Sequence, residues 1–403
     1  MNCATSRVIL PQPPAELKCL SENLASVIRA KIRLKGSIPF SHYMELALYE
    51  PGLGYYSAGL QKFGAGGDFV TAPQLGDVFA RCLAKQVEQI GNELGRYEII
   101  EAGAGSGVLA ADLLKALQDN SAADNHAPTR YRILERSAHL RQVQRETLQR
   151  SVPQWMDRIS WLDQPPATGW QGVFIANEVL DALVVERFCC HHEGIMQLHV
   201  ADGADGFGWH QAPCPQAMQE QVQAVLAGLD HPPADGYQSE INTSLPAWLQ
   251  TVTASLQKGA ALFIDYGYPR HQYYRPEHHN GTLICHYRHR AHDDPFMWPG
   301  LTDISASVDF TALAEAADRC GLAVSGYTSQ AMFLLGCGLE EVIDSFQLLS
   351  AKDRVLKNIE VRKLTSPDEM GERFQVMALS RGLSENLSEG FAEFTLADLR
   401  YRL

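Results

Sequence analysis

The sequence predicts an α/β protein whose core is a doubly wound sheet of mostly parallel strands. Strand-like and helix-like patterns alternate between residues 97 and 177, which is typical of this fold class. The clearest unit is YEIIEAGAGSGVLAADLLKAL, residues 97–117, which predicts a buried strand, a turn with three glycines and a helix. In such folds, ligands bind at the carboxyl ends of the strands. We therefore expect a ligand at the glycine turn.

The composition narrows the classes of function. The chain has 403 residues, 45% hydrophobic and 20% charged, as in an ordinary soluble globular protein. Its 47 acidic and 34 basic residues give a net charge of −13, which argues against nucleic acid as the main partner. The charge suits a cationic substrate or partner, although solubility alone can account for it. No run approaches the roughly 18 apolar residues of a membrane span, so no membrane partner is expected.

The cysteines and the first residues bear on the compartment. The nine cysteines are scattered and form no C-x-x-C motif, which predicts neither a zinc knuckle nor a disulfide scaffold. The first fifteen residues show no secretory pattern, and no amphipathic, Arg-rich segment typical of mitochondrial targeting precedes the domain. We expect a cytoplasmic protein. Whether it is a monomer or a homodimer stays open.

Residues 1–75 are expected to form an N-terminal helical and aromatic lobe that ends in a cofactor loop. After a helix, residues 38–59 are dense in aromatic residues and turn formers, and form either a tightly packed irregular lobe or a lid over a site. The loop GAGGDFVTAP, residues 64–73, precedes the strand–turn–helix unit and could fold over the cofactor. Within it, Thr71 predicts a helix cap, with Pro73 in the first turn of that helix.

Residues 76–188 are expected to form the first part of the sheet. The second strand, RYRILE, ends at Glu135, and two further strands end at Asp163 and Asn177. An acid at the tip of the second strand is where two ribose hydroxyls would be held. The alternative is a solvated acid at a helix N-terminus. The position of Glu135, two elements after the glycine turn, favours the ribose role.

The fourth strand turns from apolar to polar at Asn177 and Glu178, with Asp181 just beyond. The amide of Asn177 can both donate and accept hydrogen bonds. Glu178 and Asp181 could orient or partly deprotonate a nucleophilic nitrogen, and two carboxylates also match a guanidinium group. The alternative is that Asn177 and Glu178 cap a following helix. The place at the end of a central strand favours a catalytic role.

The rest of the chain is divided at residue 258. Residues 189–258 are interpreted as an insertion, and residues 259–403 as the second part of the core. That part contains a fifth strand, GAALFIDYGYP, and a terminal antiparallel strand, RFQVMALSRG.

Residues 281–308, within that second part, are expected to form a long loop rich in His and Arg. Its histidines and Cys285 match no zinc signature, and Arg288 and Arg290 would repel a cation. No metal site is expected.

The glycine spacing separates two cofactor classes. Glu101, Gly103, Gly105 and Gly107 form E-x-G-x-G-x-G, whereas dinucleotide binders need G-x-G-x-x-G. Val108 stands where their third glycine would be. The pattern resembles the first motif of S-adenosylmethionine-dependent methyltransferases, and a dehydrogenase is the fallback. Either way, bare backbone amides and a helix N-terminus suit a negatively charged ligand group.

Taken together, the motifs resemble the MidA-like family of S-adenosylmethionine-dependent methyltransferases, which includes a mitochondrial complex I assembly factor with protein arginine methyltransferase activity. The resemblance rests on IPFSHYMELALYEPGLGYY, GDFVTAP, the E-x-G-x-G-x-G turn, ANEVLDALVVERF, ALFIDYG, GTLICHYRHR and GLTDISASVDF, in this order. It implies a class I, Rossmann-like methyltransferase sheet with an N-terminal lobe and an inserted subdomain.

The resemblance also implies roles for single residues. S-adenosyl-L-methionine would lie on Gly103, Gly105 and Gly107, with Glu135 on its ribose. The loop with Gly67, Asp68 and Thr71 would stand close to its amino-acid end, and Asn177, Glu178 and Asp181 would face the methyl acceptor. The family often has proline and arginine where Ala104 and Ser106 stand here. The backbone path is unaffected, but that arginine's side chain has no counterpart.

Three functions remain open at this point. A methyltransferase acting on a nitrogen of a protein arginine comes first, because of the carboxylates and the resemblance. A small-molecule methyltransferase would be favoured by a deep, closed, apolar pocket. The third is an assembly or interaction protein that keeps the cofactor for stability and transfers nothing.

Overall fold

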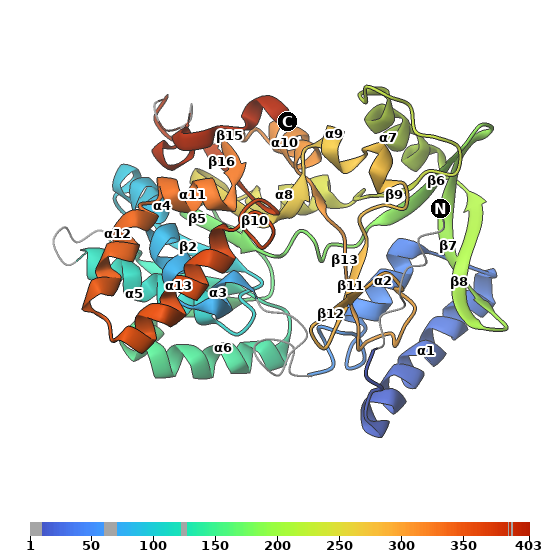
Figure 1. Ribbon diagram of the computed structural model, residues 1–403, viewed down its shortest axis with the longest axis horizontal. Helices are drawn as coiled ribbons and strands as arrows, with labels where there is room; N and C mark the ends of the chain where they lie inside the picture. Colours follow the sequence, from blue (N-terminus) through green and yellow to red (C-terminus); the bar gives the residue numbers. More distant parts are fainter. Residues whose placement is uncertain (1–9, 60–70, 122–126, 386, 388–389) are drawn as a thin grey trace. The chain divides into compact units, whose positions relative to one another are not determined.

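The computed structural model describes residues 10–59, 71–121, 127–385, 387 and 390–403. The chain divides into two compact units (Figure 1). Unit 1 consists of Met1–Val70, Ala182–Ser244 and His271–Ala306, and unit 2 of Thr71–Asp181, Leu245–Arg270 and Ser307–Leu403. Each unit has a hydrophobic core of its own.

Unit 2 is built on a sheet with the strand order β15-β16-β10-β5-β2-β3-β4. The strands β4, β3, β2, β5 and β10 are mutually parallel, and β16 is antiparallel to both of its neighbours. The bounds are β2 (Glu98–Ala102), β3 (Arg130–Leu134), β4 (Ile159–Leu162), β5 (Trp170–Asn177), β10 (Leu256–Tyr268), β14 (Val308–Asp309, beside β10), β15 (Ala323–Ser329) and β16 (Phe374–Arg381). The predicted sheet and its terminal antiparallel strand are confirmed, whereas the edge strand β15 was not predicted.

Helices cover both faces of this sheet (Figure 1). On one face, Val173 and Ile175 of β5 join the core formed with α4 (Val78–Leu94) and α5 (Val108–Ser121). On the other, Phe174 packs against Phe263, which also contacts Trp248 of α8 (Leu245–Thr253). The alternation follows from the pleat, because successive side chains of a strand point to opposite faces. The other helices are α3 (Ala72–Leu75), α6 (Ala138–Ser151), η1 (Pro153–Arg158), α10 (Phe310–Arg319), α11 (Gln330–Gly336), α12 (Leu339–Asp344), η3 (Ser345–Leu348), α13 (Ala351–Thr365), η4 (Ala392–Ala397) and η5 (Arg400–Arg402).

The strand order creates a topological switch point at β2. The chain runs from β2 outward to β3 and β4, and then returns to β5 on the other side of β2. The connections leaving β2 and β5 therefore diverge at the carboxyl ends of these strands. In open α/β sheets this is where ligands bind.

Unit 1 contains two antiparallel sheets. The larger has the order β1-β7-β6-β9, with β8 beside β7, and the smaller has the order β12-β11-β13. The bounds are α1 (Ala15–Lys35), β1 (Ile38–Pro39), α2 (Phe40–Tyr49), β6 (Glu186–His191), β7 (Gly194–Gly203), β8 (Gly206–Pro213), α7 (Gln216–Ala227), β9 (Gln238–Ile241), α9 (Arg270–Tyr273), η2 (Pro276–His278), β11 (Ile284–Tyr287), β12 (Arg290–His292) and β13 (Asp303–Ser305). The expectation of one long loop over 281–308 was wrong. Cys285 and Tyr287 alternate with partly exposed residues, a strand pattern that the histidines and arginines obscure.

The aromatic stretch 38–59 packs within unit 1. The hydroxyl of Tyr43 donates to the carbonyl oxygen of Pro295 at 2.8 Å, and that of Tyr49 to the carbonyl oxygen of Ala182 at 2.7 Å. The hydroxyl of Tyr56 donates to Oδ1 of Asp303 at 3.0 Å. Each of these hydroxyls is thus bonded to a distant segment of unit 1, as a packed lobe requires.

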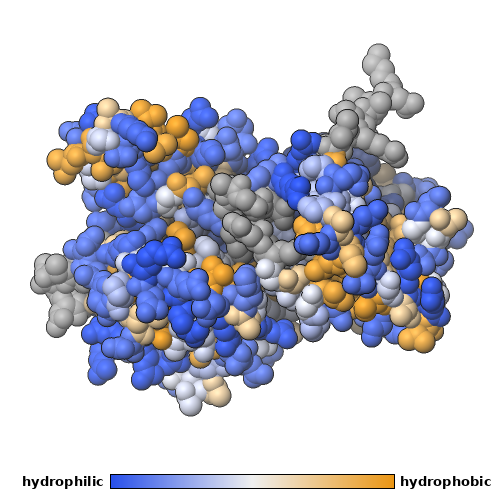
Figure 2. Space-filling view, turned by 90° about the horizontal axis from the view of Figure 1, so that it is seen from below, coloured by the Kyte–Doolittle hydropathy of each residue, from blue (hydrophilic) through white to orange (hydrophobic). Residues whose placement is uncertain are grey.

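The surface is mainly hydrophilic on the face shown in Figure 2, with separate hydrophobic patches. In unit 2, exposed apolar side chains occur along α13 and just before it, at Leu348, Val355, Leu356 and Ile359. None of the described helices is long and apolar enough to cross a membrane.

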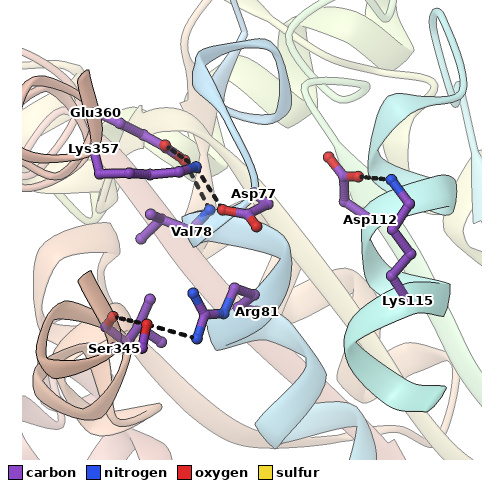
Figure 3. Close-up of polar contacts among 9 residues, drawn as sticks. Asp77, Val78, Arg81, Asp112, Lys115, Ser345, Lys357 and Glu360 are labelled. Carbon is purple, nitrogen blue, oxygen red and sulfur yellow. Dashed lines mark hydrogen bonds and ion pairs between the residues drawn. The ribbon is translucent and has the colours of Figure 1, made fainter. Parts of the chain in front are cut away.

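A residue of α13 caps the N-terminus of α4 (Figure 3). Oε1 of Glu360 accepts a hydrogen bond from the backbone N–H of Val78 at 2.7 Å. Lys357 donates to Oε2 of Glu360 at 2.7 Å and to Oδ1 of Asp77 at 2.5 Å. Asp77 occupies the N-cap position of α4 but its side chain makes no cap hydrogen bond. The cap is thus supplied by a residue nearly 300 positions away in the chain.

Replacing Glu360 with alanine should lower the free energy of unfolding by about 2 kcal/mol, because the buried N–H of Val78 loses its acceptor. Lys352→Ala, at an exposed position of the same helix, should change it by less than about 0.5 kcal/mol. Urea unfolding of both variants measures the difference. Equal losses in the two variants would contradict the capping role.

Candidate active site

The turn from β2 to α5 is shaped by glycines in left-handed conformation. Gly103, Gly105 and Gly107 have φ angles of 64°, 51° and 81°. A Cβ atom on Gly103 would lie 3.0 Å from Cγ2 of Val179, and one on Gly107 would lie 3.1 Å from Cα of Gln144. Larger residues are therefore disfavoured both by backbone conformation and by space. The turn exposes backbone directly before the positive end of α5.

Glu135 lies at the tip of β3, as the sequence predicted. Its side chain is 9% exposed. Oε1 accepts a hydrogen bond from the backbone N–H of Ser137 at 2.8 Å, and Oε2 accepts one from Nε2 of Gln144 at 3.1 Å. Burial raises the pKa of the Glu135 carboxyl, and these donors together with Arg141 oppose the rise. Each oxygen of an ionised carboxylate accepts about two hydrogen bonds, so Glu135 keeps capacity for ligand hydroxyls.

Glu101 is placed differently from the other proposed cofactor residues. It lies inside β2, two residues before the turn, and its Oε2 accepts a hydrogen bond from the hydroxyl of Tyr131 at 2.7 Å. Burial raises the pKa of Glu101 to about 7, against the opposing effect of that hydrogen bond. Glu101 therefore ties β2 to β3 beneath the turn.

Asn177 ends β5, and the chain then makes a tight turn. No helix begins between residues 178 and 185, so the helix-cap interpretation of Asn177 and Glu178 was wrong. Glu178 has a φ of 54°, a backbone conformation that residues other than glycine rarely adopt. Nδ2 of Asn177 donates to Oε1 of Glu178 at 3.2 Å. Within the described residues, the buried Oδ1 of Asn177 has no hydrogen-bond partner, which is typical of a group that meets a ligand or water.

The turn after β5 is held by Asp265 of β10, a residue that the sequence did not single out. Oδ2 of Asp265 accepts hydrogen bonds from three successive backbone N–H groups, those of Val179 at 3.1 Å, Leu180 at 2.8 Å and Asp181 at 3.2 Å. Oδ1 accepts from the N–H of Tyr266 at 2.9 Å. Asp265 is 1% exposed. We call residues 177–181 the acceptor turn, after the methyl acceptor that is expected beside them. These hydrogen bonds fix the acceptor turn to the centre of the sheet.

The charge of Asp265 is governed by its surroundings. Burial and the neighbouring charge of Glu178 raise the pKa of Asp265 to about 8, while the backbone N–H groups lower it. The only sequence signal was an aspartate at the end of an apolar strand, in ALFIDYG.

Of the loop expected near the amino-acid end of the cofactor, only the last part can be compared. Gly67 and Asp68 lie outside the described residues. Thr71 takes the N-cap position of α3 with proline in the first turn, as expected, but its side chain makes no cap hydrogen bond. No cluster of three or more His, Cys, Asp or Glu side chains suited to a metal ion occurs in the part of the chain that the structure describes.

Comparison with known proteins identifies the family. A sequence model of the family described as "Putative S-adenosyl-L-methionine-dependent methyltransferase" matches residues 78–328. The chain belongs to this family. The matched range includes the glycine turn, Glu135, the acceptor turn and Asp265.

Relatives of the methyltransferase are similar along most of its length. A crystal structure from Burkholderia thailandensis, bound to S-adenosyl-homocysteine, is 42% identical, covers 98% of this chain and 100% of its own, and has a TM-score of 0.91. The mitochondrial protein arginine methyltransferase NDUFAF7 of Danio rerio is 25% identical, over 89% of this chain and 87% of its own. The human protein of the same name is 26% identical, over 87% and 81%. The chain is thus a methyltransferase that uses S-adenosyl-L-methionine, and the predicted fold class is confirmed.

The residues at the switch point fit this cofactor. The glycine turn offers backbone where Cβ atoms would crowd Val179 and Gln144, and Glu135 offers a buried carboxylate one strand away. These are the two features that a nucleoside with a ribose diol and a charged amino-acid group requires.

Replacing Gly107 with alanine should weaken binding of S-adenosylhomocysteine by more than about tenfold, because the new Cβ displaces α6 at Gln144. Gly95→Ala is the matched control. Gly95 also has a positive φ, of 72°, but nothing lies within 4 Å of a Cβ there. The left-handed backbone alone should cost both variants about 1 kcal/mol of stability, and titration calorimetry should separate their affinities. Equal affinities would rule out the role of the turn.

Asp265→Asn should free the acceptor turn, because an amide has one oxygen for the four N–H groups that Asp265 now binds. Hydrogen exchange at residues 179–181 should become faster. Asp309→Asn, which alters a partly buried acid of unit 2 that pairs with Arg270, should leave exchange there unchanged. Unchanged exchange in Asp265→Asn would contradict the clamp.

The pH dependence of that variant follows from the raised pKa of Asp265. Since the folded value, about 8, exceeds the ordinary value of 3.8, ionising Asp265 favours the unfolded chain. The contribution of this group to wild-type stability is therefore complete below pH 3.8 and is lost as pH rises toward 8. Asp265→Asn has no ionisable group at this position, so its stability does not fall for this reason. The difference in free energy of unfolding between wild type and Asp265→Asn should therefore narrow as pH rises.

Proposed function

We propose that this methyltransferase methylates a nitrogen of arginine side chains in a protein substrate. The observation that carries the proposal is the acceptor turn, which contains Glu178 and Asp181 and follows β5, the strand that pairs with β2. Val179 lies between these two carboxylates in sequence and would touch a Cβ on Gly103 at 3.0 Å. The name of the NDUFAF7 relatives, protein arginine methyltransferase, supports the same class of acceptor.

The cofactor-binding roles are proposed as follows. The backbone of Gly103, Gly105 and Gly107 lies against the nucleoside, Glu135 accepts hydrogen bonds from the ribose hydroxyls, and Glu101 supports the turn from within β2. Asp68 and Thr71 stand near the amino-acid end. S-adenosyl-L-methionine supplies an electrophilic methyl group on a sulfonium, so the protein needs neither a metal nor a covalent intermediate.

The acceptor turn supplies what an arginine needs. A guanidinium is planar, has five N–H donors and stays charged at neutral pH, so two carboxylates can bind it as a fork and fix one nitrogen in line for attack. Glu178 and Asp181 take this role, and one of them accepts the proton that the nitrogen releases. Oδ1 of Asn177 accepts a further N–H of the same group. The net charge of −13 also favours a cationic partner.

We propose the cytoplasm as the compartment. Eight cysteines in the described residues are free thiols, which suits a reducing environment. Several NDUFAF7 relatives are mitochondrial by name. Fractionation of the native cell with an antibody tests the proposal, and recovery in an organelle or outside the cell would refute it.

Glu178→Gln should reduce methyl transfer by about 10²- to 10⁴-fold, because the amide neither holds the guanidinium by charge nor accepts its proton. Affinity for S-adenosylhomocysteine should stay within about twofold, since Glu178 lies in the turn after β5 and not at the ends of β2 and β3, where we propose that the nucleoside binds. The assay incubates wild type and variant with labelled cofactor and cell lysate and locates the label by mass spectrometry.

The control is Glu146→Gln, at an exposed acid of α6 that accepts a hydrogen bond from Nε2 of Gln142. It should transfer like wild type. Label on methylarginine in wild type and its loss in Glu178→Gln support the proposal. Label on a small molecule would favour the small-molecule alternative, and no label with intact cofactor binding would favour an assembly protein.

A further inference from the structure

A buried glutamine links the proposed cofactor-binding residues. Gln144 lies on α6 and its side chain is 0% exposed. Nε2 donates to the carbonyl oxygen of Gly105 at 3.1 Å and to Oε2 of Glu135 at 3.1 Å. Oε1 accepts from Nε1 of Trp161 at 2.9 Å. The amide thus uses three of the four hydrogen bonds that it can make, all inside the protein.

The helix that carries Gln144 is itself fixed to the strand ends. Arg141, one turn earlier on the same face of α6, donates to the carbonyl oxygens of Glu135 at 2.6 Å and Leu162 at 2.9 Å. Cα of Gln144 lies where a Cβ on Gly107 would approach to 3.1 Å. Neither the helix nor the turn can shift without moving the other.

The chemistry of an amide suits this position. A carbonyl oxygen and a carboxylate both need donors when buried, and one NH₂ group supplies a donor to each without adding charge. Trp161 has only a donor to offer, so its bond to Oε1 turns the NH₂ group toward Glu135 and Gly105. The guanidinium of Arg145 lies 4.6 Å from the centre of the Trp161 ring and covers it.

We propose that Gln144 is a positioning residue for the cofactor, holding the carboxylate of Glu135 at a fixed place against the carbonyl of Gly105. Gln144 sets the spacing between Glu135, which binds the ribose, and the glycine turn at Gly105, which lies against the nucleoside. Gln144 itself does not touch the ligand in this role. The inference rests on the proposed function in assigning Glu135 to the ribose. It goes beyond that function by assigning an essential role to a residue outside the glycine motif.

The charged groups around Glu135 define a second readout. Arg141 of α6 lowers the pKa of Glu135, as do the N–H groups of Ser137 and Arg136 and the amide of Gln144, whereas burial raises it. Glu101 of β2 is the other acid that interacts with Glu135. Without the amide of Gln144, burial is less opposed and Glu135 protonates at a higher pH. If binding requires the ionised carboxylate, then on lowering the pH the variant should lose its affinity at a higher pH than wild type does.

The test is calorimetric titration with S-adenosylhomocysteine between pH 5 and pH 9. Gln144→Leu should weaken binding by about tenfold or more at neutral pH, and the pH at which binding is half lost should move upward. Trp161→Phe keeps both bonds from Nε2 and should weaken binding less. The control Gln330→Leu removes another fully buried glutamine, which donates to the carbonyl oxygen of Leu364, and should leave affinity and pH profile unchanged.

A second variant keeps the proposal open to refutation where Gln144→Leu does not fold. Gln144→Glu retains an acceptor for Trp161 but places a carboxyl beside Glu135, so ligand binding should be coupled to a change in bound protons. Titrations in two buffers of different ionisation enthalpy detect this. Wild-type affinity and an unshifted pH profile in either Gln144 variant would overturn the proposal.

The outcomes separate this inference from the proposed function. Wild-type protein that binds S-adenosylhomocysteine but methylates no arginine overturns only the proposed function. Gln144 variants that bind like wild type while arginine is methylated overturn only the positioning role. A uniform loss of affinity at all pH values, also seen in Gln330→Leu, would mean that Gln144 contributes to stability alone.

Discussion

The hydrogen bonds accepted by the carboxyl group of Asp265 are the interaction on which the rest of the candidate site depends. They gather three successive N–H groups of the acceptor turn onto one oxygen at the centre of the sheet. Glu178 keeps a φ of 54° there because the turn has no freedom to relax. Val179, whose N–H is one of these groups, lies close to Gly103, where its Cγ2 would be 3.0 Å from an added Cβ. Without Asp265, the carboxylates of Glu178 and Asp181, which we propose to face the acceptor, would have no fixed position.

Two buried acids at strand ends have different roles because their partners differ. Asp265 accepts four backbone N–H groups and is close to saturated, as a structural acid should be. Glu135 accepts fewer hydrogen bonds, among them those from the N–H of Ser137 and the amide of Gln144, and keeps capacity for ligand hydroxyls. Counting donors around a buried carboxylate therefore distinguishes a residue that shapes the protein from one that can bind a ligand.

Local patterns made much of the fold predictable. The strand, glycine turn and helix over residues 97–117 show their periods in the sequence itself, and so does the apolar-to-polar change at Asn177. Glu135 could be placed because the end of a strand is a local feature. Alternation of strands and helices then implied the parallel sheet, and the motif resemblance supplied the cofactor class.

The features that could not be predicted from the sequence depend on contacts between segments that are distant in the chain. Gln144 bonds Gly105 and Trp161, and nothing in the apolar spacing of α6 marks it out. Asp265 lies 84 to 86 positions from the amides it binds. The helix-cap alternative failed for the same reason, because the polar residues after β5 are held by β10 and not by a helix of their own. The sheet of β11, β12 and β13 was hidden by charged residues on its exposed side.

The most direct test of the central claim is a crystal structure of the protein with S-adenosylhomocysteine. The account predicts the nucleoside against Gly103–Gly107 with its ribose hydroxyls on Glu135, the thioether sulfur facing Glu178 and Asp181, and the amides of 179–181 still on Asp265. A ligand bound elsewhere, or an acceptor turn released from Asp265 in the complex, would contradict it.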